Sequence, residues 1–318
     1  MQNNQQKKSL FEEFPPISTE KWEEKLKSDL KTDNPNAKLL WKIAEGVNIK
    51  GIYRSDDLEG CKPFESMPGS YPYLRGTKTN NNWEINRIIE TSDPAEANKL
   101  ALYAIGRGAN SIEFNCSQVR KADSLACLLK DIDLESISIR FDKPMSFKII
   151  LKHFITFVEE SKFDKSKIKG SFNWDAMAYR LISGQYYQTL DNNIDELVSL
   201  INEAELHFPN FKILTINAQH FHNGGSTVVQ ELGFTLSAAV EYTHRLLEKG
   251  ISLSVILKHI QFRMAIGSAY FMEIAKFRAL RFLWAKIITA FNPELKENAK
   301  AYIHAQSSMW NNPYSTHM

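Results

Sequence analysis

The sequence lacks most of the features that mark secreted, metal-stapled and membrane proteins. It has 3 cysteines in 318 residues and no C-x-x-C pair, which argues against a disulfide framework or a cysteine zinc site. It has no apolar run of about 18 residues, and its first residues, MQNNQQKKSL, have no apolar segment of the kind found in secretion signals. We therefore expect a cytoplasmic protein with free thiols.

The sequence also lacks an excess of charge of either sign. It has 39 basic and 37 acidic side chains, for a formal net charge of +2. Because nucleic acids and anionic membranes attract strongly basic surfaces, we expect neither as a partner. Hydrophobic residues make up 43% of the chain, which is typical of a globular protein able to build a core without disulfides or metals.

Residues 1–82 read as an N-terminal arm. A short amphipathic helix is predicted over residues 18–31, where Ser18 or Thr19 can cap the first turn and apolar side chains recur at Trp22 and Leu26. The stretch from 31 to 82 is rich in Pro, Gly, Asn and Asp, which favours extended and turn structure. The helix can pack on its own domain or on a partner chain, and the sequence leaves both open.

Residues 83–318 alternate between strand and helix patterns, which predicts an α/β fold with parallel strands and right-handed crossovers. A sheet or a barrel fits this alternation. The six readable strands are 110–115, 136–142, 170–175, 212–218, 260–267 and 300–308. The main helices between them are 94–108, 119–130, 146–161, 193–207, 226–248 and 269–291.

Polar side chains gather where these strands end, and ligand sites of parallel α/β folds lie at that edge. The candidates for substrate binding are Asn173, His220, His222 and Gln306. His220 and His222 would share one face if their strand continued through them. They could serve in a metal site, as a general acid or base, or as rim histidines bonded to a neighbour. No H-E-x-x-H motif is present, so no metal site is predicted.

Several stretches together resemble the cobalamin-dependent methylmalonyl-CoA mutase family. The segment FEEFPPISTEKWEEKLKSDLK is similar to the N-terminal arm of the family's small subunit, and YPYLRG resembles the segment leading into its first barrel strand. The helix GSAYFMEIAKFRALRFLWAKI closely matches the family pattern F-F-M-E-I-A-K-x-R-A-x-R-x-L-W-A. IHAQSSMWN resembles a family strand end. The resemblance runs over nearly the whole chain.

The resemblance implies a TIM-type (β/α)₈ barrel that holds an acyl-CoA, followed by a separate cobalamin-binding domain. The family interconverts methylmalonyl-CoA and succinyl-CoA through radicals generated from adenosylcobalamin. In its catalytic chains, a tyrosine and an arginine hold the substrate carboxylate, and a histidine lies above the carbonyl. The barrel expected here is incomplete, with six of eight strands readable, and no cobalamin domain is recognised.

Departures from the catalytic pattern imply a different role for this chain. Asn81 and Ile88 stand where catalytic chains have the arginine and tyrosine of R-P-W-T-I-R-Q-Y. His220 falls in the column of the catalytic histidine, but Phe221-His222-Asn223 matches the small-subunit form. The lower cobalt ligand motif, Asp-x-His-x-x-Gly, does not occur in the sequence.

The resemblance therefore predicts a non-catalytic small subunit whose partner is the large catalytic subunit, in a heterodimer. Adenosylcobalamin would be held by the large subunit, and this chain would bind no cofactor. The alternative is a CoA-thioester-binding barrel or enzyme that uses His220 or His222.

Overall fold

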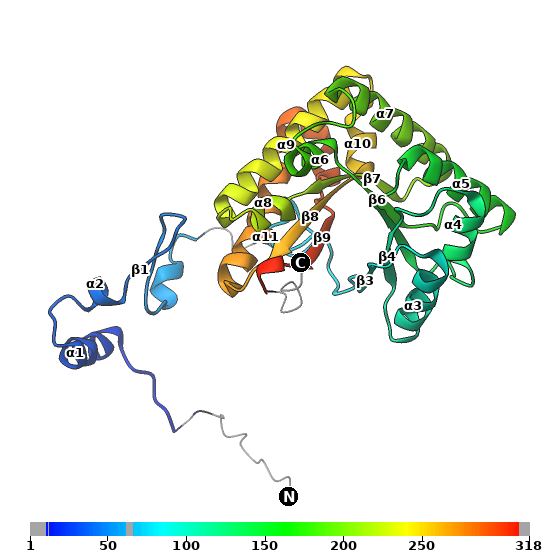
Figure 1. Cartoon of the computed structure of the whole chain (residues 1–318). Coiled ribbons are helices and arrows are strands. Elements are labelled where there is room, and N and C mark those ends of the chain that lie inside the picture. The colour runs from blue at the N-terminus through cyan, green and yellow to red at the C-terminus, as the bar shows by residue number, and fades with distance from the viewer. Residues whose placement is uncertain (1–10, 12, 62–65, 312–318) are drawn as a thin grey trace, which may run out of the picture. The chain divides into compact units, whose positions relative to one another are not determined.

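The computed structural model describes residues 11, 13–61 and 66–311. It divides into two compact units, Met1–Lys62 and Pro63–Met318. Figure 1 shows the chain coloured from blue at its N-terminal end to red at its C-terminal end.

The first unit is built from short elements. They are α1 (Thr19–Leu30), α2 (Pro35–Leu39), the antiparallel pair β1 (Trp41–Lys42) and β2 (Asn48–Ile49), and the 3-10 turn η1 (Ser55–Leu58). Ser18 caps α1 by accepting a 3.3 Å hydrogen bond from the backbone N–H of Lys21, so the predicted helix is confirmed. The Arg54 guanidinium lies 5.2 Å from the ring centre of Trp22 on that helix. No residue of α1 is buried.

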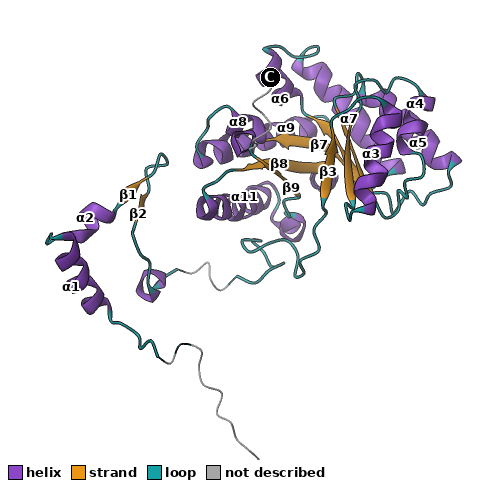
Figure 2. Ribbon diagram, turned by 60° about the horizontal axis from the view of Figure 1, so that its bottom comes forward, coloured by secondary structure: helices purple, strands orange, loops and turns teal. Residues whose placement is uncertain are grey.

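The second unit contains a parallel sheet of seven strands in the order β3-β4-β5-β6-β7-β8-β9. The strands are β3 (Asn86–Ile89), β4 (Ser111–Asn115), β5 (Ser138–Asp142), β6 (Gly170–Trp174), β7 (Phe211–Asn217), β8 (Ile260–Ile266) and β9 (Ile303–Ser307). The sheet curls into an open half-barrel with helices on its outer side (Figure 2). The predicted incomplete TIM-type barrel is therefore confirmed.

The helices follow the strands in the expected alternation. They are α3 (Pro94–Gly106), α4 (Ala122–Leu129), α5 (Phe147–Glu160), α6 (Ala176–Ser183), α7 (Leu190–His207), α8 (Gln219–Asn223), α9 (Val228–Glu248), α10 (Leu253–His259) and α11 (Tyr270–Phe291). Two 3-10 turns flank the last strand, η3 (Pro293–Asn298) and η4 (Met309–Asn311). Asp93 caps α3 with a 2.8 Å bond from the N–H of Glu96, and Pro94 occupies its first turn.

The prediction of six strands was short by one. β3 has only four residues and begins directly after the turn-rich segment, so its sequence carried little strand signal. The helices α6 and α10, with 8 and 7 residues, were also not predicted. A further difference concerns the histidines, because β7 ends at Asn217 and the chain then turns into α8.

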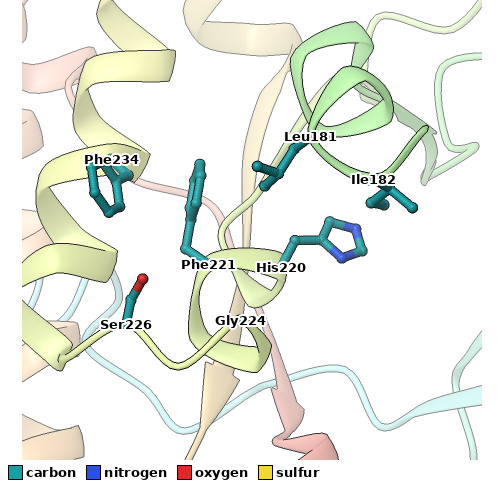
Figure 3. Close-up of a pocket in the computed structure, with 7 residues that line it drawn as sticks. All are labelled: Leu181, Ile182, His220, Phe221, Gly224, Ser226 and Phe234. Carbon is teal, nitrogen blue, oxygen red and sulfur yellow. The ribbon is translucent and has the colours of Figure 1, made fainter. Parts of the chain in front are cut away.

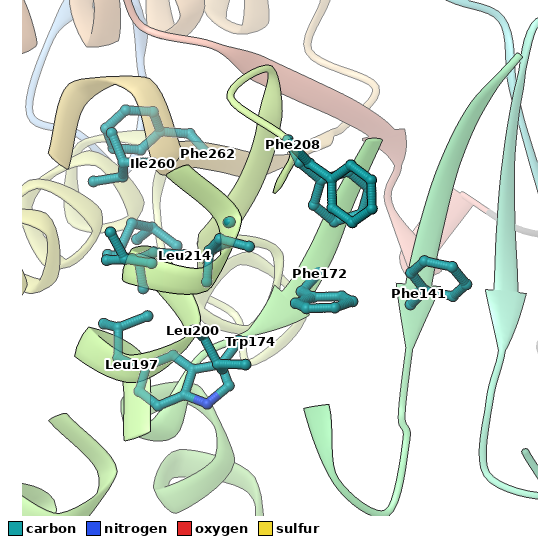
Figure 4. Packing of buried hydrophobic residues seen from close by; sticks show 14 of the residues in the cluster. Phe141, Phe172, Trp174, Leu197, Leu200, Phe208, Leu214, Ile260 and Phe262 are labelled. Atoms are coloured by element: carbon teal, nitrogen blue, oxygen red, sulfur yellow. The ribbon is translucent and has the colours of Figure 1, made fainter. Parts of the chain in front are cut away.

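The core between the sheet and the outer helices is rich in phenylalanine (Figure 4). Phe141, Phe172 and Phe211 from three neighbouring strands pack with ring centres 5.3–6.3 Å apart. Burying each such side chain contributes roughly 1.5–3 kcal/mol. Gly170 lets β6 approach this cluster, since a Cβ there would lie 1.8 Å from the carbonyl oxygen of Ile139.

Candidate functional site

The inner face of the half-barrel is lined by polar side chains. They occur at alternate positions of the strands, and the buried ones are Ser111, Glu113, Ser138, Arg140, Ser171, Thr215, Asn217, Gln261, Arg263 and His304. Sequence reasoning considered only the strand ends and missed this layer. The sequence did indicate this layer, because polar residues recur two positions apart along single strands, and such residues point to the same face.

Arg140 on β5 is the centre of this layer and is 5% exposed. Its guanidinium donates hydrogen bonds of 3.0 and 3.1 Å to the hydroxyls of Ser111 and Ser171, from the two neighbouring strands. It also donates to Gln261 Oε1 at 3.1 Å and pairs with Glu84 Oε2 at 2.9 Å. Arg140 therefore links both sides of the half-barrel and occupies the space between them.

A second group lies along β4, β8 and β9. Arg263 Nη2 is 2.8 Å from Glu113 Oε1 and 2.7 Å from Gln306 Oε1, so the candidate Gln306 is committed to an arginine of its own chain. Burial raises the pKa of Glu113, and Arg263 opposes that shift. Burial, with Arg140 and Arg263 nearby, lowers the pKa of His304 to about 2, so its imidazole is neutral.

The other sequence candidates lie at different places. Ile88 on β3 pairs in register with Glu113, so its side chain faces the interior beside that carboxyl group. Asn173 donates a 2.7 Å hydrogen bond to Asp142 Oδ1, and its own Oδ1 is buried without a partner. Asn81 is exposed in the segment before β3. The structure thus brings Gln306 and Ile88 together around Glu113, whereas Asn81 lies apart on the surface.

His220 and His222 lie on α8, so the strand does not continue through them and they share no strand face. Residues two positions apart on a helix point in widely different directions. His220 faces an opening of about 550 Å³, where its ring lies beside Ile182 (Figure 3). Burial is the main cause that lowers the pKa of His220, and the charge of Arg263 adds to it. The imidazole at this opening is therefore neutral at physiological pH.

His222 belongs to a buried network instead. Its Nδ1 is 3.2 Å from Glu231 Oε2, and its Nε2 is 2.9 Å from the Ser308 hydroxyl. Lys276 of α11, with a fully buried side chain, pairs with Glu231 at 2.8 Å and with Glu273 at 2.7 Å. The network joins α8, α9 and α11 to the end of β9.

The order Ser308, His222, Glu231 is that of a nucleophile, a base and an orienting carboxylate. A nucleophile must meet its substrate, however, and Ser308 is only 1% exposed. Its hydroxyl also accepts a 3.2 Å hydrogen bond from the backbone N–H of Trp310. The geometry suits a network that holds four elements together, and it offers no path for an acyl substrate.

Over the described part of the chain, no three His, Cys, Asp or Glu side chains are placed to hold a metal ion. Within the same residues, no helix combines the length and the apolar character that crossing a membrane requires.

Fold and inner face together define a (β/α)-barrel protein whose interior is filled by its own ion pairs. The model of the methylmalonyl-CoA mutase family matches residues 42–124 and 117–316 of the chain. The small subunit of that mutase from Porphyromonas gingivalis is 36% identical over 312 residues, covering 96% of this chain and 50% of the relative. The chain therefore belongs to the methylmalonyl-CoA mutase family.

Other relatives are less similar. The methylmalonyl-CoA mutase of Rhizobium meliloti is 27% identical, covering 85% of this chain and 42% of the relative. The large subunit from Streptomyces virginiae is 26% identical, covering 93% of this chain and 44% of the relative. The chain thus spans about half the length of the small-subunit relative and somewhat less of these two.

The family uses adenosylcobalamin, and among the described residues neither His222 nor His259 has a ring nitrogen free to ligate its cobalt. A lower cobalt ligand needs an imidazole nitrogen that is free of other bonds. Both ring nitrogens of His222 are engaged, and so are those of His259, which contact Phe211 O and Glu205 Oε1. His220 has a free ring but lies outside the ligand motif that the family uses.

Proposed function

We propose that this chain acts as a small subunit of methylmalonyl-CoA mutase, in a complex that interconverts methylmalonyl-CoA and succinyl-CoA. In this proposal the chain is not itself catalytic and supports the large subunit. The identity of 36% to a small subunit, against 26% to a large one, supports this assignment.

The observation that carries the proposal is the filled inner face. Arg140 spans the interior, and its guanidinium bonds to Ser111, Ser171, Gln261 and Glu84. A substrate passing through would have to break these contacts and leave buried charges unpaired, which costs several kcal/mol. The interior therefore favours a structural role.

The two positions that depart from the catalytic pattern support the same role. Ile88 presents an apolar side chain beside Glu113 and cannot donate a hydrogen bond to a substrate carboxylate. Losing a hydrogen bond to a charged group weakens binding by about 1.5–3 kcal/mol. Asn81, exposed and uncharged, supplies no compensating cation.

The exposed apolar side chains of the first unit support the proposal that this chain binds a partner chain. Its large apolar side chains are open to solvent: Phe14 is 74% exposed, Ile17 64%, Trp41 66% and Tyr53 59%. Monomeric proteins rarely leave so many large apolar groups uncovered on one short segment. We propose that this arm packs on the large subunit in a heterodimer, which also holds adenosylcobalamin, and that the complex is cytoplasmic.

Sedimentation velocity with a purified large subunit tests the assignment. The wild-type chain should form a one-to-one complex. The variant Trp41→Ser should weaken it, whereas Leu206→Ser, at a 77% exposed position on α7, serves as the matched control and should not. Wild-type chain that sediments independently of the large subunit would contradict the proposal.

A second candidate function rests on His220. Its neutral imidazole faces the opening between α6 and α8 and has no hydrogen-bond partner among the described residues, so it is available to a ligand such as a CoA thioester. Saturable acyl-CoA binding by the isolated chain that His220→Ala abolishes would favour this function.

A further inference from the structure

A groove adjoining the opening at His220 is walled by helices α6 and α9. It has a volume of about 660 Å³, within the range of small-molecule sites. Its walls are largely apolar and include Met177, Leu181, Phe221 and Phe234. Figure 3 shows Phe221 between Leu181 and Phe234, and the two phenylalanine rings lie 5.3 Å apart.

The polar floor of this groove contains an unused hydrogen-bond acceptor. Asn217 lines the groove and is 4% exposed, and its Oδ1 is buried without a partner. Its orientation is set by Asp175, whose Oδ2 lies 3.4 Å from Asn217 Nδ2 and accepts a 2.9 Å bond from the Asn217 backbone N–H. A buried acceptor without a partner costs about 1–3 kcal/mol, so a ligand that donates to it would recover that free energy.

The charged side chains at the rim of the groove, Glu241 and Arg180, already have partners within the chain, so they do not favour a charged ligand. Glu241 accepts a 2.6 Å hydrogen bond from Arg245 Nε, and Arg180 lies over the ring of Tyr186 at 4.9 Å. Leu181 and Phe234 are 54% and 50% exposed, so they can change rotamer without disturbing the core and give a ligand access to the floor. The groove therefore favours a neutral, flat, apolar molecule with one donor.

We propose that the groove between α6 and α9 binds a small neutral aromatic molecule whose N–H group donates to Asn217 Oδ1. Its ring packs against Phe221 and Phe234. The site lies where β7 ends at Asn217, and it does not depend on the proposed subunit role.

The test compares indole with indene, which has the same ring shape and no N–H group, on the full 318-residue chain. Each is titrated while amide resonances are followed by transverse-relaxation-optimised NMR. Indole should shift amides of α6 and α9 saturably, and indene should bind about tenfold more weakly for want of one hydrogen bond. Equal affinities, no saturable shift at millimolar concentrations, or shifts confined to other elements would overturn the proposal.

Variants distinguish the contribution of the apolar side chains that line the groove from that of the Asn217 hydrogen bond. Phe234→Ser should weaken both ligands, and Leu206→Ser on α7 should affect neither. Asn217→Leu should remove the preference for indole while indene still binds. If Asn217→Leu does not fold, as shown by loss of amide dispersion, the comparison of indole with indene and the Phe234→Ser variant still test the proposal. Binding of both ligands to Phe234→Ser with unchanged affinity would contradict the site.

Discussion

Lys276 offers the sharpest test of the network that joins α11 to the end of the half-barrel. Its ammonium group is fully buried between Glu231 and Glu273, at 2.8 and 2.7 Å, and it donates a further 2.8 Å bond to the carbonyl of Ala265. The variant Lys276→Met keeps a chain of similar length and removes the charge. It leaves two buried carboxylates without their cation, which should lower the free energy of unfolding by about 3–5 kcal/mol.

Urea unfolding followed by tryptophan fluorescence measures this change, because Trp284 is buried on the same helix. The control is Lys286→Met, an exposed position on α11, for which the loss should stay below about 1 kcal/mol. The double variant Lys276→Met with Glu231→Gln should be more stable than Lys276→Met alone, since one unpaired charge is gone. The prediction is wrong if Lys276→Met loses no more unfolding free energy than Lys286→Met. It is also wrong if the loss in the double variant equals the sum of the losses in the two single variants.

Three further predictions follow from the contacts described above. Arg140→Met should lower the free energy of unfolding by about 3 kcal/mol in urea titrations, because Glu84, Ser111 and Ser171 lose their hydrogen-bond partner. An unchanged urea midpoint would show that the Arg140 contacts do not stabilise the fold. Burial lowers the pKa of His304 to about 2, so its imidazole is neutral in the folded chain, and stability should fall as the pH drops below the unfolded-state pKa of about 6.5. In thermal melts between pH 7 and 5, His304→Gln should lose less stability than the wild-type chain. An equal loss in the two proteins would contradict this prediction. Asp93→Ala should cost about 1 kcal/mol by removing the cap of α3, whereas Asp93→Asn should retain most of the stability.

Much of the fold follows from local patterns in the sequence. Ser18, one of the two cap candidates for α1, caps that helix, and Asp93 caps α3, because a short polar side chain at that point satisfies a free backbone N–H group. The strand–helix alternation predicted the parallel strands and their helical crossovers, and the resemblance to the mutase family indicated the incomplete barrel. β3 was missed because four residues are too few to show a period.

The site was harder to predict, because its geometry depends on where strands end and which faces meet. His220 and His222 would have shared one face had β7 continued through them, but α8 begins two residues after β7 and places them in different surroundings. Gln306 was a substrate candidate by position, yet its Oε1 bonds to Arg263 from the neighbouring strand. Arg140 was overlooked, although its alternation with Ser138 and Asp142 on one strand was readable.

In the proposed small-subunit role, this chain has no catalytic site of its own. Turnover of methylmalonyl-CoA with added adenosylcobalamin measures this most directly, comparing the chain alone, a purified large subunit, and both together. The proposed role predicts no succinyl-CoA from the chain alone and turnover by the mixture that sediments as a complex. Succinyl-CoA formed by the chain alone, and abolished by His220→Ala, would contradict it.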